Sequence, residues 1–148
     1  MKTIALRFAE NFAPSCGTIA AHEELIAENG HVWYGKLGSS VSSKVSDEIL
    51  SAEDPVILLV HSGSTDRWWA HVTRIQKETP SLDEIPGYYR RKAEDFGCWF
   101  KVVRFEKADP KVMSRCTVAS SGKLLSEASR HSMSPYFIIN YLFEEKSS

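Results

Sequence analysis

Val56-Ile57-Leu58-Leu59-Val60-His61 is the most apolar run in the chain, and it decides the fold. Its five consecutive apolar residues, three of them β-branched, cannot alternate between core and water, so the run predicts a strand that is buried on both faces. Pro55 precedes the run, and a polar turn over residues 62–67 follows it. We therefore expect this strand to lie at the centre of a sheet.

The sequence on both sides of this strand predicts further strands and a few short helices. Residues 68–75 and 98–105 alternate between apolar and polar side chains, which indicates strands, the first of them a hairpin partner of the central run. Shorter strands are expected at residues 3–8, 31–35 and 136–143. Helices are expected at residues 19–28, ended by Asn29-Gly30, at 46–52, capped by Ser46, and at 123–129, opened by Ser120-Ser121-Gly122.

This order of elements indicates an α+β fold. Strands and helices do not alternate regularly, so a doubly wound parallel sheet is not expected. We predict a curled sheet, mixed or antiparallel, that forms a partial barrel flanked by two or three short helices. With 148 residues, of which 43% are hydrophobic, the chain suits a single domain over residues 1–148.

Composition excludes several classes of protein. No apolar stretch is long enough to span a membrane, and the first residues lack the pattern of a signal peptide, so a cytoplasmic protein is expected. Cys16, Cys98 and Cys116 are far apart and form no CxxC pair, which argues against disulfides and zinc. The five histidines are scattered as well, so we expect no metal and no cofactor.

The charge is close to balanced but unevenly distributed. The formal net charge of −1 argues against tight binding to duplex nucleic acid, which needs many Lys and Arg contacts. Residues 86–131, however, hold ten Lys and Arg against five Asp and Glu. A basic face is therefore compatible with a nearly neutral protein.

The common catalytic signatures are missing from the sequence. There is no GxSxG elbow, Walker A loop, dinucleotide-binding glycine pattern, HExxH motif or paired-carboxylate motif. A binding module is therefore favoured over an enzyme.

Aromatic residues come in adjacent pairs: Trp33-Tyr34, Trp68-Trp69, Tyr88-Tyr89 and Trp99-Phe100. Neighbours on a strand point to opposite faces, so one member of each strand pair can enter the core while the other faces a groove. Two interpretations stay open. Either all of them are packing residues, or two or three of them sandwich a flat ring such as a nucleobase.

The succession of these elements resembles the YTH and EVE domains of the PUA-like superfamily over residues 3–105. The similarity rests on Gly30-His31-Val32-Trp33, on the central strand with its Ser62-Gly63 turn, on Trp69-Ala70-His71-Val72 and on Trp99-Phe100-Lys101-Val102. The resemblance implies recognition of a modified or flipped base in an aromatic cage. Trp33 matches one cage wall and Tyr34 a contact to the base edge; Asn11, Ser62 and Gly63 belong to the same implied ligand site.

Other parts of that implied site stay open. Candidates for the second wall are Trp68, Tyr88 and Tyr89. Contacts to the nucleic-acid backbone could come from basic side chains, for which a solvated face is an equally good interpretation. These side chains are Lys36, Arg90, Arg91, Lys92, Lys101, Arg104 and Lys107. Nucleic acid carrying a modified base, or a free nucleotide, is the expected partner.

Two other functions compete with this one. The chain is also similar to ASCH-type PUA-like proteins, which can hydrolyse amides on modified nucleosides using Lys, Thr and Glu. Lys36 and Ser39 match this arrangement in part, but Ser replaces Thr and no Glu can be assigned. The other alternative is a sensor of a free nucleotide or a protein-interaction adaptor that holds a peptide in the same pocket, and the near-zero net charge favours this class over tight duplex binding.

Overall fold

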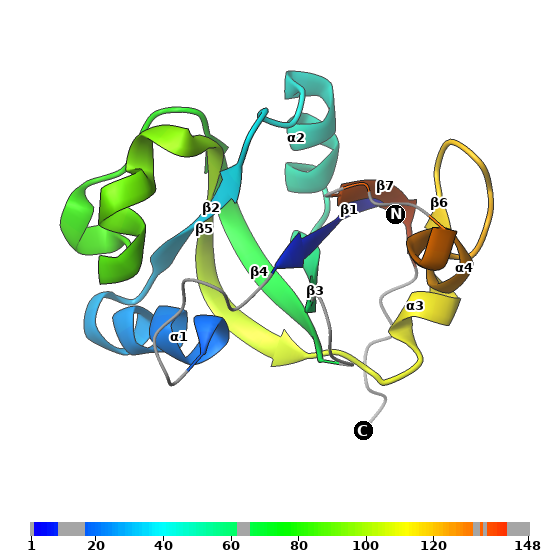
Figure 1. The fold of residues 1–148 in the computed structure, drawn as a ribbon, viewed down its shortest axis with the longest axis horizontal. Coiled ribbons are helices and arrows are strands. Elements are labelled where there is room, and N and C mark those ends of the chain that lie inside the picture. The colour runs from blue at the N-terminus through cyan, green and yellow to red at the C-terminus, as the bar shows by residue number, and fades with distance from the viewer. Residues whose placement is uncertain (1, 9–16, 62–65, 132–133, 135, 142–148) are drawn as a thin grey trace.

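The computed structural model describes residues 2–8, 17–61, 66–131, 134 and 136–141. Seven strands form one sheet in the order β2-β5-β4-β3-β1-β7-β6, with short helices around it (Figure 1). The strands are β1 (Lys2–Phe8), β2 (Val32–Leu37), β3 (Val56–His61), β4 (Arg67–Gln76), β5 (Phe96–Lys107), β6 (Thr117–Val118) and β7 (Tyr136–Asn140). The α-helices are α1 (Thr18–Asn29), α2 (Ser43–Leu50), α3 (Val112–Arg115) and α4 (Leu125–His131), and two 3₁₀ helices are η1 (Leu82–Glu84) and η2 (Gly87–Asp95).

The apolar run is the middle strand of the sheet, as predicted. β3 pairs in parallel with β1, with Phe8 opposite His61, and antiparallel with β4 on its other side. Val56 and Leu59 are at most 1% exposed, and so are the two residues between them. The parallel pair makes the sheet mixed, and β1 in turn pairs antiparallel with β7.

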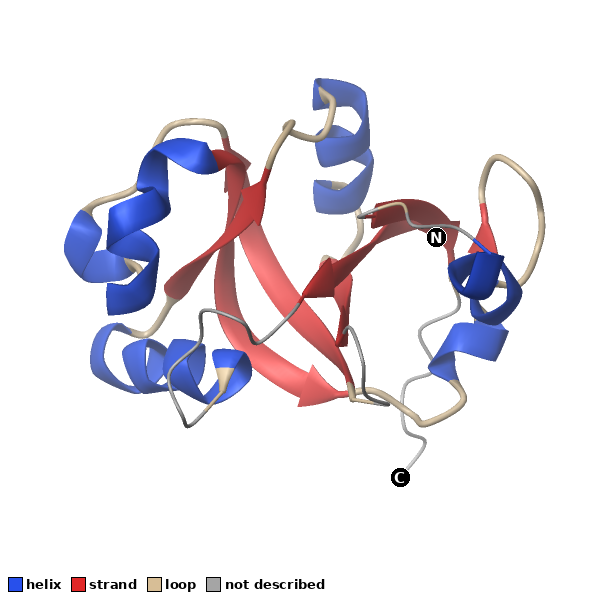
Figure 2. Cartoon of the chain, viewed as in Figure 1, coloured by secondary structure: helices blue, strands red, loops and turns tan. Residues whose placement is uncertain are grey.

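The sheet curls without closing, which confirms the predicted partial barrel (Figure 2). β2 and β6 are its two edges, and no backbone pairing joins β2 to β7 among the described strands. A side-chain contact bridges this seam, because the Lys36 ammonium of β2 lies 4.7 Å from the centre of the Tyr136 ring on β7.

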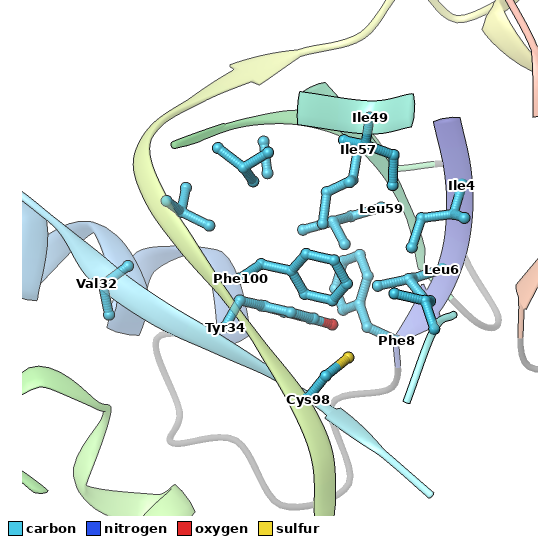
Figure 3. Packing of buried hydrophobic residues seen from close by; sticks show 14 of the residues in the cluster. Ile4, Leu6, Phe8, Val32, Tyr34, Ile49, Ile57, Leu59, Cys98 and Phe100 are labelled. Atoms are coloured by element: carbon cyan, nitrogen blue, oxygen red, sulfur yellow. The ribbon is translucent and has the colours of Figure 1, made fainter. Parts of the chain in front are cut away.

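The inner face of the curl holds the main core. Leu6, Tyr34, Leu59 and Phe100 come from four different strands and point toward one another (Figure 3). Helix α2 closes the curl with Ile49, which is 1% exposed. Such a core requires inward residues at every second position of each strand. This alternation identified β4 and β5 in the sequence, whereas β3 was identified by its continuous apolar run.

The outer face is covered by two separate groups of elements. Next to β1, β3 and β7, the segment from α3 to α4 buries Met113 and Leu125 against Leu58 and Trp69. Next to β2 and β5, the two 3₁₀ helices bury Trp33 and Trp99, together with Ile85, Tyr89, Ala93 and Phe96. These 3₁₀ helices lie between the strands expected at residues 68–75 and 98–105, where the sequence predicts no helix.

Helix boundaries depart from the predicted ones in two places. Helix α2 begins at Ser43, and its cap is Ser42, whose hydroxyl accepts a hydrogen bond from the Val45 N–H at 3.2 Å, so Ser46 lies inside the helix. Helix α4 begins at Leu125, after a loop that contains Gly122 at a φ of 72°. The polar run around Gly122 thus forms a turn instead of opening a helix. No helix in the described part of the chain has the length and apolar character needed to cross a membrane.

Two glycines make a close backbone approach beside the curl. A Cβ on Gly97 would lie 1.9 Å from the carbonyl oxygen of Gly38, so the loop after β2 can rest on the start of β5 only if residue 97 has no side chain.

We expect Gly97→Ala to lower the free energy of unfolding by about 1–3 kcal/mol, measured by denaturant titration. Gly87→Ala is the control, since a Cβ there meets nothing within 4 Å; equal stability of the two variants would contradict the contact.

Candidate functional site

An open pocket lies where β1 and β3 end and α1 begins. Its volume is about 400 Å³, within the range of roughly 300–1,000 Å³ that is usual for small-molecule sites. Its described lining residues are Phe8, Gly17, Ile19, Ala20, Glu23, His61, Asp66 and Trp68. We call this the aromatic pocket, because three of these residues carry aromatic rings.

The sheet topology brings the three rings together. Because β1 and β3 are parallel, their carboxyl-terminal residues, Phe8 and His61, lie side by side at the same end of the two strands. The two rings meet edge to face, with centroids 5.1 Å apart. Trp68 is contributed by β4, where it stands opposite Leu59 on the inner face, while Trp69 stands opposite Leu58 on the outer face.

Charged groups surround the aromatic pocket unevenly. Glu23 and Asp66 line it, and both are exposed. The Asp66 backbone is held in place because its carbonyl oxygen accepts a hydrogen bond from the His61 N–H at 3.1 Å. The ammonium of Lys107, on the neighbouring strand β5, lies 6.0 Å from the centre of the Trp68 ring. The site therefore combines ring faces and carboxylates, with a cation beside Trp68.

A second aromatic group surrounds His22 on the other side of α1. The His22 ring is fully buried, and the rings of Tyr34 and Tyr89 lie 5.2 Å from it, with Tyr88 at 6.4 Å and Phe105 at 6.1 Å. Its Nδ1–H donates to the Thr18 carbonyl oxygen at 2.8 Å, and its Nε2 has no hydrogen-bond partner among the described residues. Burial lowers the pKa of His22 to about 4, and burial raises the pKa of Tyr34 and of Tyr89.

The tryptophan expected to form a cage wall, Trp33, lies on the covered outer face of the sheet. Trp33 is 5% exposed and packs under the 3₁₀ helices with Tyr89, Phe96 and Trp99. The ring centroids of Phe96 and Trp99 are 4.8 Å apart, and those of Tyr89 and Phe96 are 4.7 Å apart. A base would have to displace these side chains to reach Trp33, whereas the aromatic pocket offers open space.

The predicted ligand residues thus fall into two groups. Trp33, Tyr34, Tyr88 and Tyr89 lie together around β2 and η2, and Trp68 lies in the aromatic pocket. Asn11, Ser62 and Gly63 lie outside the described residues. In the sequence, Asn11 comes shortly after β1, and Ser62-Gly63 directly follows β3.

Lys36 is buried at the seam of the barrel. Only 6% of the residue is exposed, and burial lowers the pKa of its ammonium group. The ammonium donates to the backbone carbonyl oxygens of Ser39 at 2.5 Å and Leu37 at 3.4 Å. Cys98 stands opposite Lys36 on β5, and burial raises the pKa of its thiol. Lys36 thus contacts the backbone carbonyl of Ser39. No carboxylate of the described residues pairs with Lys36, so the acidic partner of the ASCH-type arrangement is not found among them.

The other basic candidates do not gather on one face. Arg104 lies 3.3 Å from Glu106, whose carboxylate is 3.0 Å from Nε2 of the buried His71, and Asp54 is 3.0 Å from Nδ1 of the same ring. Arg104 is therefore part of an ion-pair network. Arg90, Arg91 and Lys92 are on η2, and Arg90 donates to the Leu82 carbonyl oxygen at 3.1 Å. Lys101 is half-buried on β5. Of all these cations, Lys107 is the one in contact range of the aromatic pocket.

A larger hollow of about 830 Å³ lies between α2 and β7. Its lining includes Lys2, Lys44, Ser120, Ser121 and Tyr136. Lys2 is 3.8 Å from Glu48, which also lines it. Tyr136 and Phe137 are neighbours on one strand and point to opposite faces, so they do not form a pair of walls around a flat ring.

Sequence reasoning missed Phe8, His61, Glu23 and Asp66 as pocket residues. Phe8 and His61 were seen only as ends of predicted strands. Their proximity depends on the parallel pairing of β1 with β3, which no pattern within either strand indicates. The signal that could have located the site is the Ser-Gly turn after the central strand, since turns at such strand ends often carry function.

Comparison with known proteins identifies one family. A family model described as Pua-like matches residues 4–139. No curated protein and no solved structure matches the chain.

The buried His22 makes stability depend on pH. Its folded pKa of about 4 lies below the model-compound value of 6.5, so the unfolded chain takes up a proton first as the pH falls. The resulting stability is fully present above about pH 6.5 and is lost as the pH falls toward 4. Between pH 7 and pH 5 we expect this histidine to account for about 2 kcal/mol of lost unfolding free energy. His22→Gln should flatten the pH profile measured by urea titration, while the exposed-site control His131→Gln should not; parallel profiles for wild type and His22→Gln would contradict the assignment.

Proposed function

The chain belongs to the Pua-like family, and on that premise we propose that it binds nucleic acid and holds one modified or flipped nucleobase in the aromatic pocket. Membership of this family suggests nucleic-acid binding; the base-reading site is the further step. The observation that carries it is the convergence of Phe8, His61 and Trp68 from three strands around an open volume of base-binding size.

The energetics support a base as the occupant. Unstacking a base from its strand costs a few kcal/mol, and stacking on an aromatic side chain returns about 1–3 kcal/mol per base. Phe8 is 6% exposed and is held against His61, so one part of the pocket is already ordered before binding. Little binding energy is then used to organise the site.

The strand that carries the base would be held by few cations. Lys107 stands beside Trp68 and is exposed, which suits contact with a phosphate next to the bound base. The near-neutral chain and the ion-paired Arg104 fit binding to a single extruded nucleotide better than tight binding along a duplex. In this proposal Trp33, Tyr34, Tyr88 and Tyr89 are packing residues that do not touch the base.

The adjacent tryptophans of β4 allow a matched test. Trp68→Ala should weaken binding to modified single-stranded oligonucleotides by roughly 5- to 150-fold, the loss expected for one stacked base. Trp69→Ala removes an outer-face residue that packs on Tyr141, so it should lower stability by about 3–5 kcal/mol and leave the affinity of the folded protein unchanged. Fluorescence anisotropy with a panel of modified and unmodified strands and free nucleosides measures the first effect, and urea titration the second.

Three outcomes bear on the choice of site and partner. If Trp33→Ala stays folded and loses binding while Trp68→Ala binds normally, the base-binding site is the closed cluster and the proposal is wrong. If a free nucleotide binds as tightly as any strand, the protein is a nucleotide sensor and the nucleic-acid part of the proposal is wrong. Preference for a strand with one modified base supports both parts.

A second candidate function rests on Lys36. A buried lysine with a lowered pKa is a suitable base or nucleophile, which favours hydrolysis of an amide on a modified nucleoside. If this function is correct, the wild-type protein releases the acyl group from an N-acylated cytidine, and Lys36→Met does not. Chromatography measures the release. Lys44→Met, an exposed lysine, is the control. Absence of release by the wild-type protein would exclude this candidate, and release that survives in Lys36→Met would exclude Lys36 as its catalyst.

A further inference from the structure

The charges lining the aromatic pocket point to one class of base. Its described lining contains two carboxylates, Glu23 and Asp66, and neither Lys nor Arg. A phosphate is repelled by such a lining, and a neutral base gains little from it. Resting on the proposed function, we propose that the pocket selects a positively charged base, that is, a purine alkylated on a ring nitrogen that carries no proton of its own, such as N1 of adenine.

Ring faces and carboxylates act together on such a ligand. The π face of Trp68 attracts a flat cation in addition to stacking on it, because the ring quadrupole is negative over the face. A carboxylate at the pocket wall adds a direct charge interaction that is partly screened because Glu23 and Asp66 are exposed. A neutral base gains the stacking alone, so the cation should bind about tenfold more tightly or better.

Glu23 is the more specific of the two carboxylates. Its side chain projects from α1 at the pocket, and no hydrogen bond or ion pair joins it to another described residue. Glu24, the next residue, is equally exposed but does not line the pocket. A structural role in the helix would make the two residues equivalent, whereas a role in the pocket distinguishes them.

The positive groups near the pocket do not contradict this selection. The first turn of α1 carries a partial positive charge. Glu23 lies in the second turn of the same helix, and its carboxylate opposes this charge at the pocket. Lys107 stands beside Trp68 and is not among the lining residues, so it can meet the phosphate of the nucleotide whose base is bound. Separate locations for the two charges match a nucleotide with a cationic base and an anionic backbone.

Alkylation on the pairing edge also lowers the cost of extrusion. A purine methylated at a pairing nitrogen cannot form its normal Watson–Crick pair. Damaged or mismatched bases require the least energy to leave the stack. Methylation of adenine at N1 therefore creates the charge that the pocket attracts and releases the base that must enter it.

Two isomers separate charge from size. 1-Methyladenosine is a cation at neutral pH, and N6-methyladenosine carries the same methyl group on the exocyclic nitrogen and has no charge. Each is offered as a nucleoside and as the single modified base of a short strand, with affinity measured by calorimetry. The wild-type protein should prefer the cation at least about tenfold. Glu23→Gln should lower this preference about three- to tenfold through weaker binding of the cation alone, and Glu24→Gln should leave it unchanged.

The outcomes distinguish this inference from the function on which it rests. Equal binding of the two isomers, both weakened by Trp68→Ala, would overturn the charge selection and leave base binding intact. A preference that is unchanged in the double variant Glu23→Gln, Asp66→Asn would also overturn it, because the carboxylates would then have no part in selection. Failure of every strand and nucleoside to bind, in wild type as in Trp68→Ala, would instead overturn the proposed function itself.

Discussion

The parallel pairing of β1 with β3 is the constraint on which the rest of the fold depends. Parallel strands cannot be joined by a tight turn, so the chain between them must cross over. The crossover contains α1, β2 and α2, and it carries β2 to the far edge of the sheet, where it pairs with β5. The carboxyl ends of β1 and β3 then lie at the same end of the sheet, beside the start of α1 and the start of β4. The aromatic pocket is a direct result of this arrangement.

Much of the fold was predictable because it is encoded locally. The run from Val56 to His61 is apolar at consecutive positions, and the alternation in β4 and β5 is the normal mark of strands with two different faces. Asn29-Gly30 ends α1 as expected, with Gly30 in the left-handed conformation at a φ of 81°. Turns, alternation and helix caps involve residues close in sequence, so one chain suffices to identify them.

What could not be predicted depends on contacts between distant residues. Residues 82–95 look polar, yet they form the two 3₁₀ helices that cover Trp33, and they turn a few apolar residues inward, among them Ile85, Tyr89 and Ala93. The resemblance drew attention to Trp33 as an exposed wall, and burial under these helices is invisible without the fold. Trp68 was one of several second-wall candidates. Of the other two rings, His61 is close to Trp68 in sequence, but Phe8 is distant and reaches His61 only through the parallel pairing of β1 with β3.

The position of β1 between β3 and β7 has a consequence for how the protein is made. Strand β1 is synthesised before the other strands of the sheet, but one side of it waits for residues 136–140, whose pairing places Lys2 opposite Asn140. Until then the growing chain presents an open strand edge that bears apolar side chains such as Ile4 and Leu6. Exposed edges of this kind recruit other strands. A chain that has not yet added residues 136–140 therefore presents one side of β1 to which a strand of another chain can pair.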